Sequence, residues 1–510
     1  MKKIFLLLFM LLPLAVGAQN GQQQEFDDFL KQAQGEFESY EKQINYEFAE
    51  ALRTQWEEFQ VFKGEEVPVK PKPAKMHVAP AETDLVSEVI PATPAPVENS
   101  FLGTAARAVT RAVIHKWLTW QSRQITAEDM LKARKTISDH IDKSKLIPKP
   151  LKQMMTFYNV PVSIDVPAEY TQYKMAGNNE NDVADFWQYL TASSFEYVVK
   201  QVAEDAEKKG LENWGLFKYI ETVSENVYTK GHEDEQEVFK VFLANQLGLD
   251  VKVGRANDKL VAMVAIAQRV YEWMSIRLDD KKYYFKHDDE DLTSLHTYQM
   301  TFKEPVAQID LLKSMPDLLS PPGKIQTRTF TSSAFGCDIN IPLDTNICHF
   351  MEEFPRVRCD IPAMTDVGSQ LAQSLYDTMY PKVKDMSQHD AVHTLMKFMY
   401  NDFAYATDQD QFGYEKPFFC EENFLYPYND CEDRSILFSY LVRHILGMEV
   451  ILLDYPDHIM TAVYFDEQIT GSYVMHDGRK FYICDPTYLD SSPGMLYPGY
   501  RGVGCQILTI

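Results

Sequence analysis

Two stretches of the chain match each other at a constant interval of 199 residues, and this repeat limits the possible folds more than any other sequence feature. The matching positions are Glu233-Asp234, Phe239, Leu247-Gly248 and Val251 in the first copy and Glu432-Asp433, Phe438, Leu446-Gly447 and Val450 in the second. In both copies a helical pattern ends at Leu-Gly, then a strand follows (LVAMVAI or IMTAVYF), and then KYYF or KFYI. The shared order and spacing predict a tandem duplication, with units at about residues 155–300 and 350–500.

A further pair of segments supports the same interpretation. NVPVSIDVPAEY resembles FPRVRCDIPAMT, and both are typical of a strand that leads into a helical region. The sequence QTRTFTSSAFGCDINI, between the two units, is rich in β-forming residues and is expected to connect them.

The first residues have the composition of a secretory signal. MKKIFLLLFMLLPLAVGAQN contains two lysines, an apolar run too short for a membrane span, and small residues before the expected cleavage site after Ala18. Residues 1–18 are therefore predicted to be a signal peptide, and the mature protein to be exported, either periplasmic or secreted. No later segment is long and apolar enough to predict a transmembrane span.

Composition divides the rest of the chain. Aromatic and aliphatic residues recur every three or four positions up to about Phe62, which predicts an amphipathic helix over residues 19–63 that docks on the body, self-associates or binds a partner. Residues 64–99 are rich in Pro, Ala and Val and predict an extended linker. Residues 100–153 predict a helical connector. The two repeat units are assigned to residues 154–300 and 301–510.

Charge and cysteine content narrow the function. A formal net charge of -24 argues against a nucleic-acid partner. All seven cysteines lie between Cys337 and Cys505. An odd number leaves at least one thiol unpaired or in an intermolecular bridge, and if Cys431 is that thiol, the other six could form up to three disulfides or none.

Cys431 stands at the predicted start of a helix. Asp430 is a suitable N-cap, Asp433 lies in the capping-box position, and apolar residues recur at helical spacing until Gly447. The positive end of a helix favours the thiolate form of a cysteine. A buried cysteine on a core helix is the alternative.

Two further residues can complete a cysteine-based catalytic site. His458 opens the strand HIMTAVYF, and Asp485 follows the strand KFYIC immediately before Pro486. Thiol catalysis requires a base for the thiol and a third group that orients the base, and a hairpin packed on a helix can bring these three residues together. A zinc site is the less favoured use of Cys, His and Asp, so no metal and no cofactor are predicted.

The segments NDCEDRS, PDHIMTAVYF and YICDPTY resemble the cysteine, histidine and aspartate boxes of the transglutaminase-like (papain-like cysteine peptidase) superfamily, over roughly residues 386–488. The resemblance implies an α+β fold of tandem transglutaminase-like units, in which a nucleophile helix packs on an antiparallel sheet. It also implies that Cys431 is the nucleophile, His458 the general base and acid, and Asp485 the residue that fixes the imidazole tautomer.

The sequence departs from that family in two ways. Asn429 replaces the glycine that is common before Asp-Cys, and no tryptophan or glutamine stands clearly in the oxyanion position, for which Gln411 is the candidate. Carboxylates around Cys431 oppose thiolate formation. In the first unit the repeat places His232, Lys259 and about His287 at the three positions, which predicts a degenerate copy without a nucleophile, although its histidines and acidic residues could in principle bind a metal.

These features predict an exported thiol hydrolase or acyltransferase that acts on an amide bond, of the peptidase or transglutaminase type. Its expected partner is a protein or peptide substrate, with cell-wall peptide among the candidates. The alternative is a catalytically silent binding or scaffold protein of the cell envelope that uses the same fold.

Overall fold

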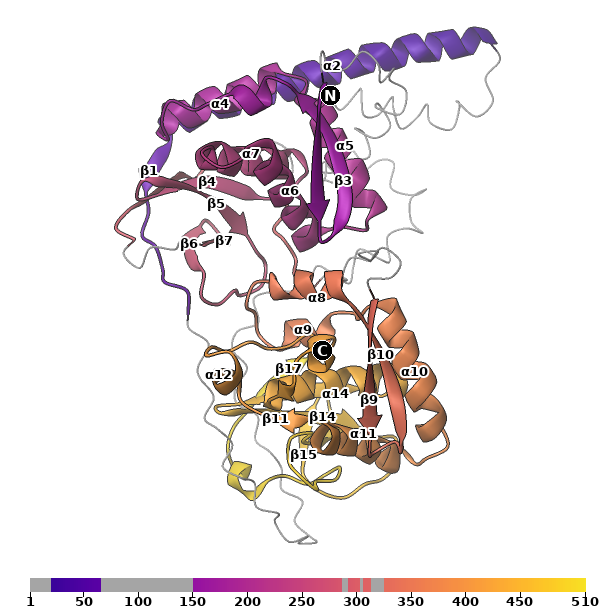
Figure 1. Cartoon of the computed structure of the whole chain (residues 1–510). Helices are drawn as coiled ribbons and strands as arrows, with labels where there is room; N and C mark the ends of the chain where they lie inside the picture. The colour runs from indigo at the N-terminus through magenta and orange to yellow at the C-terminus, as the bar shows by residue number, and fades with distance from the viewer. Residues whose placement is uncertain (1–19, 66–149, 287–291, 303–305, 313–324) are drawn as a thin grey trace. The chain divides into compact units, whose positions relative to one another are not determined.

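The computed structural model describes residues 20–65, 150–286, 292–302, 306–312 and 325–510, which form two compact units (Figure 1). The first contains residues 20–65 and 150–312, and the second contains residues 325–510. Both mix α-helices with antiparallel sheets, as expected for an α+β fold. The predicted signal peptide, almost all of the linker and most of the helical connector lie outside the described residues.

The first unit begins with the long helix α2 (Asn20–Thr54), which packs on α4 (Glu180–Ala192) (Figure 1). Phe48 and Leu52 are buried, and the Trp187 indole donates a hydrogen bond of 2.9 Å to Asn45. The helix therefore docks on the body of its own unit. It ends earlier than predicted, because β1 (Trp56–Glu58) pairs with β8 (Leu295–Tyr298), a partner that is distant in the sequence.

A hairpin, further helices and a sheet complete the first unit. The hairpin pairs β2 (Pro150–Phe157) with β3 (Val160–Pro167). The helices after α4 are α5 (Phe195–Lys208), α6 (Asn213–Val227) and α7 (Glu233–Gln246). The sheet has the order β1-β8-β4-β5-β7-β6, with β4 (Val251–Ala256), β5 (Lys259–Ala265), β6 (Met274–Leu278) and β7 (Lys281–Phe285). Helix α7 packs against β4 and β5.

The second unit repeats this order of elements. It starts with a hairpin of β9 (Ile325–Ser332) and β10 (Cys337–Asp344), followed by α8 (Thr345–Glu352), α9 (Asp360–Met364), α10 (Ser369–Val383) and α11 (Gln388–Asp402). The short elements β11 (Ala404–Tyr405), α12 (Asp408–Gln411), α13 (Glu422–Leu425) and β12 (Tyr428–Asn429) lead to α14 (Cys431–Ile445).

The second sheet has the order β15-β16-β14-β13-β17, with β13 (Val450–Tyr455), β14 (His458–Tyr464), β15 (Tyr473–His476), β16 (Arg479–Cys484) and β17 (Gln506–Thr509). Its strand order corresponds to β6-β7-β5-β4-β8 of the first unit. The register also corresponds, because Val251 faces Val264 in one sheet and Val450 faces Val463 in the other. Both pairs obey the 199-residue interval of the sequence.

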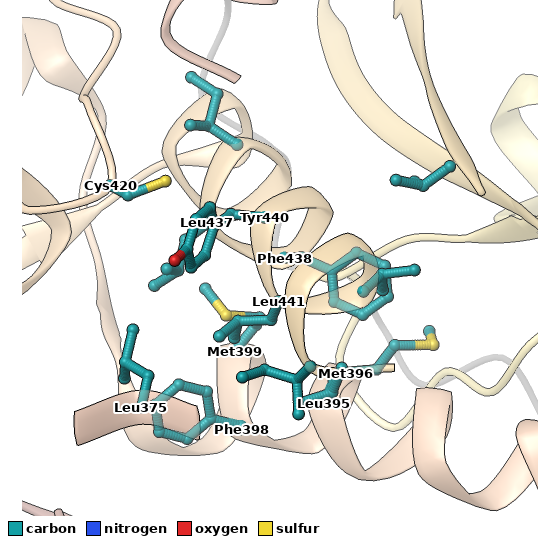
Figure 2. Packing of buried hydrophobic residues seen from close by; sticks show 14 of the residues in the cluster. Leu375, Leu395, Met396, Phe398, Met399, Cys420, Leu437, Phe438, Tyr440 and Leu441 are labelled. Carbon is teal, nitrogen blue, oxygen red and sulfur yellow. The ribbon is translucent and has the colours of Figure 1, made fainter. Parts of the chain in front are cut away.

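Helix α14 lies in the main core of the second unit, where Phe438 and Leu441 are fully buried (Figure 2). The same cluster includes Leu375 of α10 and Met396 and Met399 of α11. A separate cluster includes Leu453, Met460 and Ile483. It consists mainly of every second residue along the strands of the sheet. The strands HIMTAVYF and KFYIC therefore have apolar residues buried on both sides.

Three sequence predictions need correction. The D-x-P-A segments differ: Asp165–Pro167 ends strand β3, whereas Asp360–Ala363 begins helix α9. The segment QTRTFTSSAFGCDINI forms the hairpin of the second unit and is its counterpart of β2 and β3. Residues 150–153 are in strand β2 rather than in a helical connector, because they pair with β3.

The predicted boundary after residue 300 also lies too early. Ala307 and Ile309 form bridges with Leu249 and Ile266, so this segment belongs to the first unit.

Candidate active site

Cys431 is the first residue of α14 and is 4% exposed. The Asp430 carboxylate accepts hydrogen bonds from the backbone N–H groups of Glu432 and Asp433, and the Asp433 carboxylate accepts one from the backbone N–H of Asp430. The predicted N-cap and capping box are therefore present. The Cys431 thiol lies 3.7 Å from the Glu432 carboxylate. Its position at the helix N-terminus favours negative charge, and the adjacent carboxylate opposes it.

His458 and Asp485 form a buried pair. His458 Nε2 lies 2.9 Å from Asp485 Oδ2, and the two side chains are 2% and 1% exposed. Asp485 Oδ1 accepts hydrogen bonds from the backbone N–H groups of Thr487 and Tyr488, at 2.9 and 3.3 Å. These bonds fix the carboxylate, which in turn fixes the imidazole ring. Because Asp485 contacts Nε2, the other ring nitrogen, Nδ1, remains the one that can exchange a proton with a thiol.

Two hydroxyl groups fix the elements that carry these residues. Ser435, in the first turns of α14, donates a hydrogen bond of 3.1 Å to the carbonyl of Ile459, the residue after His458. Thr461 of β14 donates to the carbonyl of Cys484, the residue before Asp485. The helix start, the beginning of β14 and the end of β16 are thus linked to one another.

Tyr500 lies beside the His458–Asp485 pair. Its ring stacks on the His458 imidazole with a centroid distance of 5.4 Å and an interplanar angle of 15°. Burial raises the pKa of Tyr500, and negative charge on Asp457, Asp485 and Cys431 raises it further. Tyr500 follows the last sequence box and belongs to no recognisable motif, so it could not be identified from the sequence.

A second tyrosine lies on the side of the site formed by β11. Tyr405 pairs with Asn429, two residues before the cysteine. Burial raises the pKa of Tyr405, and negative charge on Cys431 and Asp430 raises it further. The phenol is therefore neutral, and it is carried by a strand that pairs with the segment leading into Cys431. Its place depends on a parallel pairing of two short strands, which local sequence does not reveal.

Arg434 places a buried positive charge next to Tyr405. Its guanidinium lies 5.1 Å from the centroid of the Tyr405 ring and donates a hydrogen bond to the carbonyl of Phe403. Burial lowers the pKa of Arg434 overall, although Tyr405, Asp430, Asp433 and Asp485 oppose this shift. A sequence signal for Arg434 exists in D-C-E-D-R-S. Arg434 follows Cys431 by three positions, and residues three apart on a helix lie on one face.

Three buried carboxyl groups lie beside the cysteine. Oxygen atoms of Asp408, Asp430 and Asp433 lie within 4.8 Å of one another. Burial, together with negative charge on Asp430, raises the pKa of Asp408 to about 9, so this carboxyl group is protonated at neutral pH. Such a group of oxygens could hold a hard cation, but proton sharing accounts for the same arrangement.

The remaining predicted site residues have other positions. The Gln411 amide donates to the carbonyl of Tyr428 at 3.4 Å, which uses one of the N–H groups that could stabilise an oxyanion. His232 is the N-cap of α7, with Nδ1 at 3.6 Å from Glu235 Oε2, and Lys259 begins β5. These two residues correspond in position to Cys431 and His458. His287 lies outside the described residues.

None of the seven cysteines forms a disulfide. Cys431 is therefore not held in a disulfide, and of the outcomes left open by the sequence, up to three disulfides or none, the structure has none. Burial raises the pKa of Cys348 to about 12, and it also raises the pKa values of Cys420 and Cys484.

No family model matches the chain, and no curated protein or solved structure is significantly similar to it. Among the helices that the structure describes, none combines the length and the apolar character needed to cross a membrane.

Proposed function

We propose that this protein is a thiol hydrolase or acyltransferase that acts on amide bonds, and that its second unit carries the active site. The observation that supports this most directly is the buried hydrogen bond between His458 and Asp485, next to the Tyr500 ring that stacks on His458. Together with the sequence boxes, it favours a transglutaminase-like unit with a Cys-His-Asp triad.

In the proposed reaction, the Cys431 sulfur attacks the carbonyl carbon of an amide and His458 Nδ1 takes up the thiol proton. Collapse of the tetrahedral intermediate breaks the C–N bond, and the imidazolium returns the proton to the leaving amine. A thioester remains on Cys431. Water then gives an acid, or a second amine gives a new amide, and either step regenerates the thiol. The backbone N–H of Cys431 and the Tyr405 phenol are the candidate donors to the oxyanion.

The duplicated topology supports tandem transglutaminase-like units, of which the first has lost its nucleophile. His232 and Lys259 stand where the second unit has Cys431 and His458. Export to the periplasm or medium remains part of the proposal and depends on the signal-like sequence of residues 1–18. The substrate is proposed to be a protein or peptide.

Alkylation with iodoacetamide at neutral pH tests whether the thiol is reactive. We expect Cys431 to be labelled rapidly and the Cys431→Ala variant to lose this label. A Cys337→Ser background gives a cleaner measurement, because Cys337 is the partly exposed cysteine outside the site. Equal labelling of the two proteins, mapped by peptide mass spectrometry, would contradict the proposed nucleophile.

A catalytically silent scaffold is the second candidate, because Cys431 is nearly buried and lies beside Glu432 and Asp430. Incubation with casein and a fluorescent primary amine distinguishes the two candidates if the enzyme accepts protein substrates. Incorporation of the amine or release of peptides, lost in Cys431→Ala, supports the enzyme. A thiol that resists alkylation, together with no turnover, favours the scaffold.

A further inference from the structure

Helix α11 carries two histidines one turn apart in its first half. His389 and His393 are four residues apart in the segment HDAVH, so both side chains lie on one face of the helix. Their imidazole rings have centroids 6.1 Å apart and an interplanar angle of 60°. Both residues are partly exposed, and the His389 side chain is 37% exposed. Neither histidine belongs to the candidate active site.

Two imidazoles in this arrangement can bind one metal ion. Zinc binds an imidazole nitrogen at about 2.0–2.1 Å, so a tetrahedral ion bound by two rings places the ring centroids about 5 Å apart. The observed distance is about 1 Å larger, and a small rotation of the two partly exposed side chains supplies this difference. Hard cations take oxygen ligands, whereas imidazole suits zinc, nickel and copper. The histidine pair therefore favours a divalent transition metal.

A carboxylate orients the first of the two rings. Asp390 Oδ1 lies 3.2 Å from His389 Nδ1. In the neutral imidazole, this contact favours the hydrogen on Nδ1 and leaves the lone pair of Nε2 for a metal ion. Histidines that bind metals almost always have such an acceptor on their other ring nitrogen, because the acceptor fixes the tautomer and raises the basicity of the ligand.

The segment that follows β14 holds the start of α11 in place. The Glu467 carboxylate accepts a hydrogen bond of 2.5 Å from the backbone N–H of His389. The Gln388 amide donates to Asp466 Oδ2 at 3.2 Å, and its oxygen accepts from the backbone N–H of Asp466 at 2.8 Å. These bonds fix the backbone that carries His389. The carboxylates of Asp390, Asp466 and Glu467 also offset the positive partial charge of the helix N-terminus, which by itself disfavours a cation.

We propose that His389 and His393 form a binding site for a divalent transition-metal ion, with Zn²⁺ as the reference ion. The two imidazole nitrogens supply two ligands, and water molecules complete the coordination shell. Helix α11 packs on α14, so a bound ion stabilises the second unit at an element that supports the nucleophile helix. The ion takes no part in the thiol chemistry, and this proposal does not depend on the proposed function.

Chemical protection locates the site. Diethyl pyrocarbonate acylates accessible imidazoles, and peptide mass spectrometry measures the modification of each histidine. The full-length Cys431→Ala protein without a polyhistidine tag is used, because the substitution removes a competing thiol. We expect Zn²⁺ to suppress most of the modification of both His389 and His393. His476 is the internal control, since it lies 3.6 Å from the carboxylate of Asp477 but has no second histidine four residues away.

The control defines the result that would overturn the proposal. Modification of His476 should continue at its usual rate when Zn²⁺ is present. If Zn²⁺ leaves the modification of His389 or His393 unchanged, or protects His476 to the same extent, the two histidines do not form a specific site.

Variants measure the contribution of each ligand in calorimetric titrations with Zn²⁺. We expect His389→Ala and His393→Ala each to weaken binding at least about tenfold, because a single imidazole lacks the gain that comes from two linked ligands. Asp390→Asn should weaken binding about tenfold through the orientation of His389. His476→Ala should bind as wild type does. Melting temperatures without metal verify that each variant folds. If His389→Ala or His393→Ala binds Zn²⁺ as tightly as His476→Ala, the pair does not chelate the ion and the proposal fails.

Discussion

At the scale of single residues, Asp485 determines which imidazole nitrogen can react. In an Asp485→Asn variant, the amide oxygen can still accept the hydrogen bond from the backbone N–H of Thr487. The amide nitrogen then faces His458 Nε2 and donates a hydrogen bond to it. The ring must then carry its hydrogen on Nδ1, where it cannot accept the thiol proton. We expect Asp485→Asn to slow alkylation of Cys431 by about 10²-fold, within the usual range for loss of a general base. Asp457→Asn removes an exposed charge beside the site and is the control. Equal slowing in both variants would refute the role of the His458–Asp485 bond.

Asp408 gives a pH-dependent prediction at the same scale. Its pKa is raised to about 9 by burial, so between about pH 4 and pH 9 the folded protein holds a proton that the unfolded chain releases. Asp408 therefore lowers stability as pH rises through this interval. We expect Asp408→Asn to raise the melting temperature at pH 9 by a few degrees relative to wild type, and to have little effect at pH 4. Calorimetry at both pH values measures this. A variant that is less stable at pH 9 would indicate an ionised carboxylate with a cation partner.

At the scale of elements, the bond from Ser435 to Ile459 holds α14 on β14. Ser435→Ala removes it and leaves a buried carbonyl with one acceptor contact fewer, at a cost of about 1 kcal/mol. Ser439→Ala is the matched control, because this hydroxyl donates to a carbonyl of its own helix, that of Ile436. Because all cysteines belong to the second unit, their reactivity with Ellman's reagent during urea unfolding reports on this unit alone. We expect the unfolding midpoint to fall for Ser435→Ala and to change less for Ser439→Ala. A larger fall of the midpoint for Ser439→Ala than for Ser435→Ala would contradict this role of the Ser435–Ile459 hydrogen bond.

The elements of the site could be predicted because their signals are local. The cap at Asp430, the stop at Gly447, which adopts a φ of 67°, and the strands that carry His458 and Asp485 are all present as predicted. Features that depend on distant pairing could not be predicted. Trp56 leaves the helical pattern because it pairs with Tyr298. The D-x-P-A segments fit both a strand end and a first helical turn, since proline is tolerated in each, and only the surrounding structure decides between them.

At the scale of the whole molecule, each unit has its own core, and the sequence repeat identifies equivalent core positions. Leu441 of α14 corresponds to Phe242 of α7, and both are fully buried. Phe242 packs on Trp187 and Phe195, with centroid distances of 5.0 and 5.4 Å. Truncation of either side chain to alanine should cost about 3 kcal/mol.

The two truncations test whether the units are independent folding units. We expect Leu441→Ala to increase amide hydrogen exchange in α14 by about 10²-fold and to leave α7 unchanged, because exchange of core helices follows the stability of the cooperative unit that contains them. Phe242→Ala should give the converse pattern. Mass spectrometry of peptides from both helices measures the two effects in one sample. If either variant accelerates exchange in both helices equally, the two units unfold together as one cooperative unit.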